Sequence, residues 1–148
     1  MITFETLSGA EASEHRDEVL GVWSVVFGRV NDPDAWAVSP WDRHRSRAGY
    51  RLVLAREDER LIGFAWGHTG ERGQYWSDFI TRELGPSVDG WVGGHFEFVE
   101  LAGDAVHHRV VVGALALVEG FQLVFGVLRV LAGQPWQGFS AAAIGAMA

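Results

Sequence analysis

Residues 50–68, YRLVLAREDERLIGFAWGH, contain the pattern that decides the fold. Two apolar runs, 50–55 and 60–68, flank the charged tetrapeptide Arg56-Glu57-Asp58-Glu59. Apolar runs on either side of a short polar turn are typical of a β-hairpin. The sequence therefore predicts two antiparallel strands here. The segment 95–102, HFEFVELA, predicts a third strand of the same sheet.

The chain before and after this hairpin predicts a mixture of strands and helices. Ile2 to Leu7 alternates apolar and polar residues, which suits an opening strand. A helix is expected near Ala12 to Phe27, with acidic residues in its first turns. Residues 31–49 contain two prolines and mixed charge, and we expect an irregular loop there. A short helix is predicted from Tyr75 to Leu84, bounded by glycines.

The last third of the chain predicts a helix from about Ala105 to Val124, a strand from Gly126 to Leu131 and a short helix from Gly138 to Ala148. The resulting order is β-α-loop-β-β-α-β-α-β-α, which is typical of a mixed α/β domain. With 148 residues, the chain is long enough for one domain with its own core.

The composition excludes several classes of protein. A hydrophobic content of 48% with 21% charged residues is globular rather than disordered. The net charge of -7, without a basic stripe, argues against a nucleic-acid partner. The absence of cysteine excludes disulfides and thiolate metal sites. The acidic N-terminus lacks the apolar region of a signal peptide, so a cytoplasmic location is expected.

A transmembrane interpretation of residues 110–132 is the alternative for the apolar end of the chain, because the run has about the length of a membrane span. The run contains Glu119, Gln122 and Arg129, which are costly in lipid. A membrane partner is therefore the less favoured interpretation.

Two segments together point to a known family. RLVLAREDERLIGFAWGHTGERGQYWSD (51–78), followed by WVGGHFEFVELAGD (91–104), resembles the first two-thirds of a GCN5-related N-acetyltransferase (GNAT). The resemblance covers Ile2 to Asp104, is most specific from 50 to 104, and is lost over 120–148. It implies one acyltransferase domain over 1–148. Its fold would be a mixed, mostly antiparallel sheet flanked by helices, and its donor substrate would be acetyl-CoA.

The resemblance also implies where CoA would bind. The family's pyrophosphate turn has the pattern Gln/Arg-x-x-Gly-x-Gly/Ala, which aligns here with His108, Val111 and Gly113. Amides at a helix start bind anions, but the Val111 side chain obstructs a phosphate that must approach the backbone closely. The implied CoA-binding residues are Leu101, Ala102, Gly103, His108, Arg109, Val111, Val112, Gly113 and Ala114.

The same turn has a purely structural interpretation, in which three consecutive valines begin a buried helix. If the turn does bind CoA, Arg109 and His108 would replace part of the lost attraction by direct charge contact. The resemblance further implies that the backbone at Leu101 and Gly103 bonds the pantetheine arm and the thioester carbonyl.

Acetyl transfer to an amine needs a base that takes the amine proton. The resemblance places this base at Glu97, with Glu100 as the second choice. Burial among apolar neighbours would raise the pKa of such a carboxyl toward a useful value. Strict alternation divides the strand into one face with Glu97, Val99 and Leu101 and another with Phe96, Phe98 and Glu100. A structural ion pair between Glu97 and an arginine is the open alternative.

One feature of the family is missing. GNAT proteins often supply a tyrosine, from the helix after the fifth strand, that protonates the departing thiolate. This chain has tyrosine only at positions 50 and 75, and Phe139 lacks a hydroxyl. Water would have to serve instead, or the reaction would be slow.

The histidines and tryptophans allow two further interpretations. His95, His107 and His108 lie near Glu97 and Asp104 in the sequence, but their spacing matches no ligand pattern, so no metal is predicted. The tryptophans of this acidic chain are expected in the core and in the walls of a substrate cleft. Those placed near an acceptor pocket are Trp66, Trp76 and Trp91.

The leading interpretation is an N-acetyltransferase whose acceptor is a small-molecule amine or a peptide amino group. The alternative is a non-catalytic or truncated GNAT-derived domain with weak or no CoA binding. Family members continue through two more strands, whereas this sequence stops at Ala148. Divergence, truncation or a frame change after Gly103 would each explain this, and a homodimer partner could cover the gap.

Overall fold

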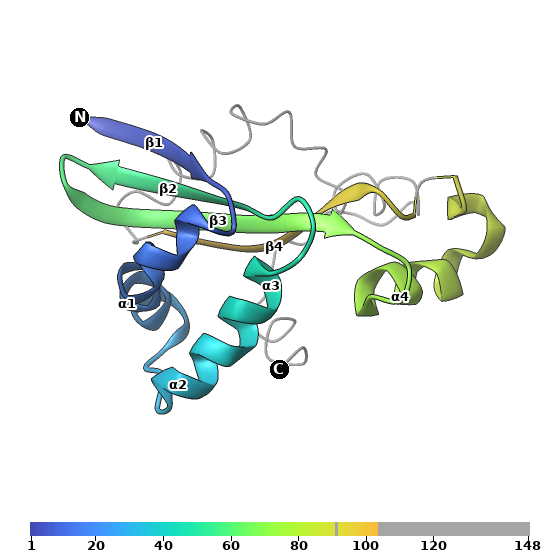
Figure 1. The fold of residues 1–148 in the computed structure, drawn as a ribbon, viewed down its shortest axis with the longest axis horizontal. Coiled ribbons are helices and arrows are strands. Elements are labelled where there is room, and N and C mark those ends of the chain that lie inside the picture. Colours follow the sequence, from blue (N-terminus) through green and yellow to red (C-terminus); the bar gives the residue numbers. More distant parts are fainter. Residues whose placement is uncertain (91, 104–148) are drawn as a thin grey trace.

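The computed structural model of the protein describes residues 1–90 and 92–103 (Figure 1). The elements predicted at 105–124, 126–131 and 138–148 lie outside this part of the chain, as does the apolar run 110–132. Within the described part, no helix is both long enough and apolar enough to cross a membrane.

In the part of the chain that the structure describes, a four-stranded antiparallel sheet forms the centre of the fold. Its strands are β1 (Ile2–Leu7), β2 (Arg51–Glu57), β3 (Arg60–Gly70) and β4 (His95–Gly103), and each pairs with the next along the chain. The predicted opening strand, hairpin and third sheet strand are therefore confirmed. The hairpin turn is shorter than expected, because β2 and β3 extend to include Arg56, Glu57 and the residues opposite them.

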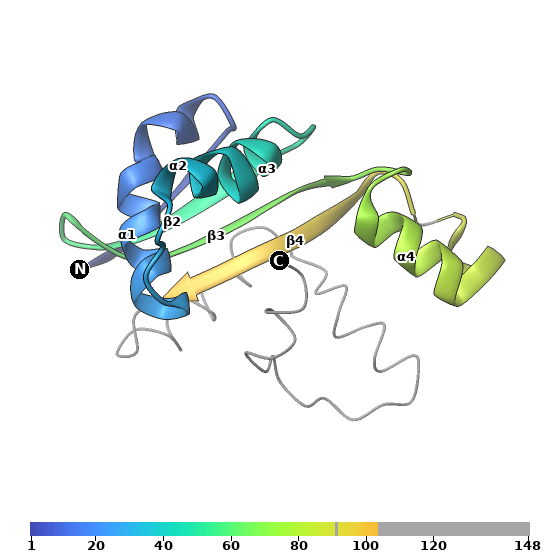
Figure 2. The same cartoon turned by 90° about the horizontal axis from the view of Figure 1, so that it is seen from below.

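Helices α1 to α3 cover one face of this sheet (Figure 2). The expected helix near 12–27 begins as a 3₁₀ turn, Glu11–His15, and continues as α1 (Arg16–Phe27). The three following segments are α2 (Pro33–Trp36), a π-helical turn (Ala37–Asp42) and α3 (Arg43–Arg45).

The prediction of an irregular loop at 31–49 is therefore wrong. Asp32 caps α2 by accepting the Ala35 N–H at 2.9 Å, and Pro33 occupies the first helical turn, where its missing N–H costs nothing. The helical turns then bury Trp36 and Trp41 against the sheet. Burial of such large rings favours helical turns, which the proline and charge content of this segment did not indicate.

An aromatic core lies between these helices and the sheet. Trp41 stacks on Trp36 and meets Trp66 of β3 edge-on, with ring centroids 5.7 Å apart in both pairs. Trp66 also stacks on Phe64 at 4.9 Å and is only 2% exposed. Trp66 was expected near an acceptor pocket, but its neighbours enclose it in the aromatic core.

The opposite face of the sheet is also buried. Val53, Ala55, Ile62 and Ala65 form a second cluster there, joined by partly buried residues of β1 and β4. Burial on both faces explains why the sequences of β2 and β3 are continuous apolar runs.

The helix predicted at 75–84 is confirmed as α4 (Tyr75–Leu84), which packs against the short 3₁₀ turn Gly85–Val88.

Candidate functional site

The candidate site begins at a β-bulge in β4. Phe98 lies opposite Gly67 of β3, and Glu100 lies opposite Trp66, the residue next to Gly67. Val99 therefore has no partner on β3. An extra residue of this kind bends the strand and redirects the side chains that follow, and bulges are over-represented beside active sites.

The bulge places Glu100 on the same face of β4 as Glu97, toward the helices. Glu100 contacts α1, and Glu97 lies opposite a residue of β3 that contacts α3. Leu101 packs with Phe98 in the cluster on the other face, whereas Val99 packs against the aromatic core. Strict alternation is therefore wrong after Val99, because one inserted residue shifts every later side chain to the opposite face.

A tryptophan of α1 holds Glu100. The Trp23 indole N–H donates to Glu100 Oε1 at 2.8 Å. Burial raises the pKa of Glu100 to about 7, and the Trp23 hydrogen bond opposes this rise. A carboxyl with this pKa is partly protonated at neutral pH, so it can both give and take a proton.

Glu97 lacks such a partner. Its Oε2 atom is buried, and within residues 1–90 and 92–103 it accepts no hydrogen bond and Glu97 forms no ion pair. Burial raises the pKa of Glu97, and the positive charge of Arg47 opposes this rise. A buried oxygen without a donor costs about 1–3 kcal/mol, which a bound N–H group would recover.

Two histidines lie beside Glu97 in a directed chain of hydrogen bonds. Arg43 can only donate, so its contact with His44 Nε2 at 3.5 Å makes that nitrogen an acceptor. His44 Nδ1–H then donates to His68 Nε2 at 3.2 Å, and His68 Nδ1–H donates to the Thr69 carbonyl at 3.1 Å. His68 is fully buried and lies directly opposite Glu97 in the sheet.

Both histidines are neutral near pH 7. Burial lowers the pKa of His44 to about 4, helped by the nearby His68, and burial also lowers the pKa of His68. Neither residue stood out in the sequence, where histidines were considered as metal ligands and, at position 108, as a CoA contact. Trp23 was equally unrecognised, although it falls on the inward face of the predicted first helix.

The remaining predicted site residues fall into two groups. Ala102 and Gly103 are buried at the end of β4, where they pair with Phe64 and Gly63 of β3. Among the described strands β4 is an edge strand, so one side of its backbone faces no other described strand. The other implied CoA-binding residues lie outside the described part of the chain, namely His108, Arg109, Val111, Val112, Gly113 and Ala114.

The residues considered for a metal site, and the tryptophans placed near an acceptor pocket, also lie partly inside and partly outside the described part of the chain. No group of three or more histidine, aspartate or glutamate side chains suited to a metal ion occurs in the described part. His107, His108 and Asp104 lie outside it, as does Trp91. Trp76 is half-buried on α4, where it meets Phe79 edge-on at 5.3 Å.

No protein-family model matches this chain. No curated protein matches it either. Among solved structures, a ribosomal-protein-alanine N-acetyltransferase from Brucella melitensis biovar Abortus 2308 is similar, with a TM-score of 0.41 and 15% identity over 78% of this chain and 70% of that one.

Two aminoglycoside acetyltransferases from uncultured soil metagenomic samples are also similar. One has a TM-score of 0.45 and 16% identity over 90% of this chain and 75% of its own. The other, crystallised with trehalose, has a TM-score of 0.48 and 12% identity over 94% and 91%. Similarity at this level is no evidence of a shared activity.

Proposed function

We propose that the protein is an N-acetyltransferase that transfers the acetyl group of acetyl-CoA to an amine. The observation that carries this proposal is the Glu97 carboxylate. It is half-buried, has an oxygen without a donor, and lies two residues before the bulge of β4. An acceptor ammonium placed there would supply the missing donor, and its proton would pass to Glu97.

The reaction then follows from the chemistry of a thioester and an amine. Glu97 takes a proton from the ammonium, and the freed nitrogen lone pair attacks the thioester carbonyl carbon. The tetrahedral intermediate collapses as the carbon–sulfur bond breaks. The nitrogen passes its second proton to Glu100. The CoA thiolate gains a proton from water, and the resulting hydroxide is neutralised by the proton that Glu97 releases to solvent. Glu97 needs a raised pKa for this role, and burial supplies it.

Glu100 is the second candidate for proton transfer. It lies on the same face as Glu97 because of the bulge, and Trp23 fixes its orientation. Its pKa of about 7 makes it suited to accept the second proton of the acceptor nitrogen.

The donor would lie along the edge of β4 that pairs with no other described strand. As the GNAT resemblance implies, the backbone at Leu101 and Gly103 would bond the pantetheine arm, and the turn from His108 to Ala114 would hold the pyrophosphate. An edge strand suits this role, because its outward N–H and C=O groups face no other described strand.

The proposal is tested by binding and by transfer. Acetyl-CoA at 100 times its Kd should stabilise the protein by about 2.7 kcal/mol in a thermal shift. Release of the CoA thiol should follow the addition of amines, and Glu97→Gln should lower the rate about 10²- to 10⁴-fold. The matched control is Glu59→Gln, at an exposed carboxylate of the β2–β3 turn. Absence of both stabilisation and transfer would instead support a non-catalytic domain.

A further inference from the structure

Arg47 is a half-buried cation without a counter-ion among the described residues. Two other half-buried arginines of the described chain have one, since Arg45 binds Asp42 at 2.8 Å and Arg56 binds Glu18 at 2.6 Å. Arg47 takes part in no side-chain hydrogen bond or ion pair with a described residue, although the chain carries a net charge of -7. Partial burial of a charge costs free energy unless a partner compensates it. The missing partner therefore needs an explanation.

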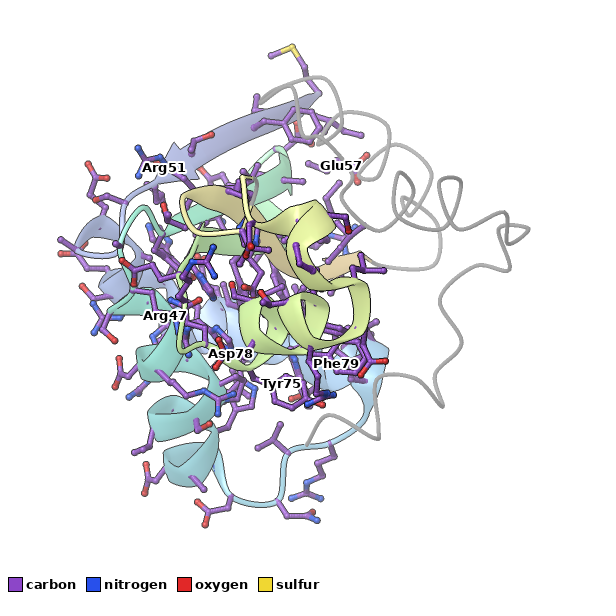
Figure 3. The ribbon with its side chains drawn as sticks, turned by 90° about the vertical axis from the view of Figure 1, so that its right-hand side faces the viewer. Arg47, Arg51, Glu57, Tyr75, Asp78 and Phe79 are labelled. Carbon is purple, nitrogen blue, oxygen red and sulfur yellow. The ribbon has the colours of Figure 1, made fainter. Side chains whose placement is uncertain are left out.

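The fold places Arg47 beside the proposed base. The Thr69 N–H donates to the carbonyl of Ala48, the next residue after Arg47, at 2.8 Å. Thr69 follows His68, which lies opposite Glu97. Figure 3 views the molecule from the end where β3 leads into α4, with Arg47 on the side of α3. The positive charge of Arg47 lowers the pKa of Glu97, although no ion pair joins the two residues.

We infer that the acceptor is an amine that also carries a carboxylate, and that Arg47 binds this carboxylate while Glu97 receives the ammonium group. The inference rests on the proposed acetyl transfer. Each end of such a zwitterion supplies what one protein group lacks. Its carboxylate is the counter-ion for the guanidinium, and its N–H group is the donor for Glu97 Oε2.

The chemistry of the guanidinium supports this class of acceptor. Its planar fork matches a carboxylate in a two-bond arrangement, so it would orient the acceptor as well as attract it. A polyamine would instead place additional positive charge near Arg47 and would be repelled. The site therefore favours amino acids over polycationic amines.

The test compares matched acceptors by the rate of CoA thiol release. Glycine, β-alanine, 4-aminobutyrate and 6-aminohexanoate are each paired with the amine that lacks only the carboxylate, and leucine and phenylalanine are paired with their amides. We expect kcat/KM to be about 10- to 100-fold higher for the carboxylate-bearing member of the preferred pair. The preferred chain length then reports the separation of the two charged groups.

Variants assign this preference to Arg47. Arg47→Gln should remove most of the preference, measured as the ratio of kcat/KM for the two members of a pair, because any change at Glu97 that affects both acceptors cancels in this ratio. Arg47→Lys, which keeps the charge but loses the fork, should retain part of it. Arg51→Gln is the matched control, because Arg51 is an exposed arginine of the same segment without an ion pair to a described residue. Melting temperatures check that each variant folds.

The outcomes separate this inference from the proposed function. Transfer to amines without a carboxylate preference, or an equal loss in Arg51→Gln and Arg47→Gln, would overturn the role of Arg47 and leave acetyl transfer standing. Failure of every amine to be acetylated, with acetyl-CoA present and the protein folded, would overturn both.

Discussion

Replacing Glu100 with glutamine is expected to stabilise the protein above neutral pH. Burial raises the pKa of Glu100 from an ordinary value of 4.5 to about 7. The folded state therefore holds this proton more tightly than the unfolded state. The free energy of unfolding must then fall as pH rises from about 4.5 to about 7. At about 1.4 kcal/mol per pH unit, the full loss is about 3 kcal/mol.

Glutamine keeps the shape of Glu100 and remains neutral at every pH. Its carbonyl oxygen can still accept the Trp23 N–H that now reaches Glu100 Oε1 at 2.8 Å. Because part of the Glu100 side chain remains accessible to water, we expect the Glu100→Gln protein to be more stable by about 2 to 3 kcal/mol at pH 8 to 9. Near pH 4 the two proteins should have similar stability.

Urea unfolding at half-unit steps from pH 4 to pH 9 measures this difference directly. Trp23→Phe removes the N–H that favours the carboxylate, so it should raise the pKa of Glu100 further in the wild-type background. In the Glu100→Gln background, Trp23→Phe should add no new pH dependence. A constant stability difference between wild type and Glu100→Gln over this range would refute the reasoning, because it would mean that folding does not change the proton affinity of Glu100.

Three further predictions concern His44, Glu97 and Val111. His44 has its pKa lowered from 6.5 to about 4 by burial and by His68, so the unfolded state binds its proton first and stability is lost as pH falls from about 6.5 to about 4. His44→Gln should reduce this loss, and equal slopes of melting temperature against pH in both proteins would contradict it. Glu97→Gln should change the pH–rate profile, and an unchanged profile would remove Glu97 from the mechanism. Val111→Gly should strengthen CoA binding in calorimetry while lowering the melting temperature of the free protein by the equivalent of up to about 1 kcal/mol; lower stability without tighter binding would make that turn purely structural.

The elements that the sequence predicted well are those whose signals are local. The hairpin of β2 and β3 follows from apolar runs around a charged turn, and α4 from glycines on either side of a helical segment. The turns at 33–45 depend instead on distant contacts. They form where Trp36 and Trp41 contact the ring of Trp66 on β3. No pattern within residues 33–45 predicts this contact with a distant strand.

The bulge of β4 was missed for a related reason. The bulge arises in the pairing of β3 with β4, two strands that α4 separates in the sequence. The alternation of apolar and polar residues describes one strand only and does not include its partner. One signal was nevertheless present. An isolated glycine inside a strand marks a bulge or a close approach, and Gly67 is such a residue. A side chain at position 67 would collide with the Phe96 ring and the Glu97 carbonyl.

This inserted residue gives the two carboxyl groups different surroundings on the same face. Glu100 lies against α1, where burial outweighs the Trp23 bond and leaves its pKa near 7. Burial raises the pKa of Glu97, and the positive charge of Arg47 opposes this rise by favouring the carboxylate form. Two carboxyls whose pKa values are set by different neighbours suit a site in which one takes the first proton and the other takes the next. Without the bulge, Glu100 would lie on the opposite face, and this division of roles would be lost.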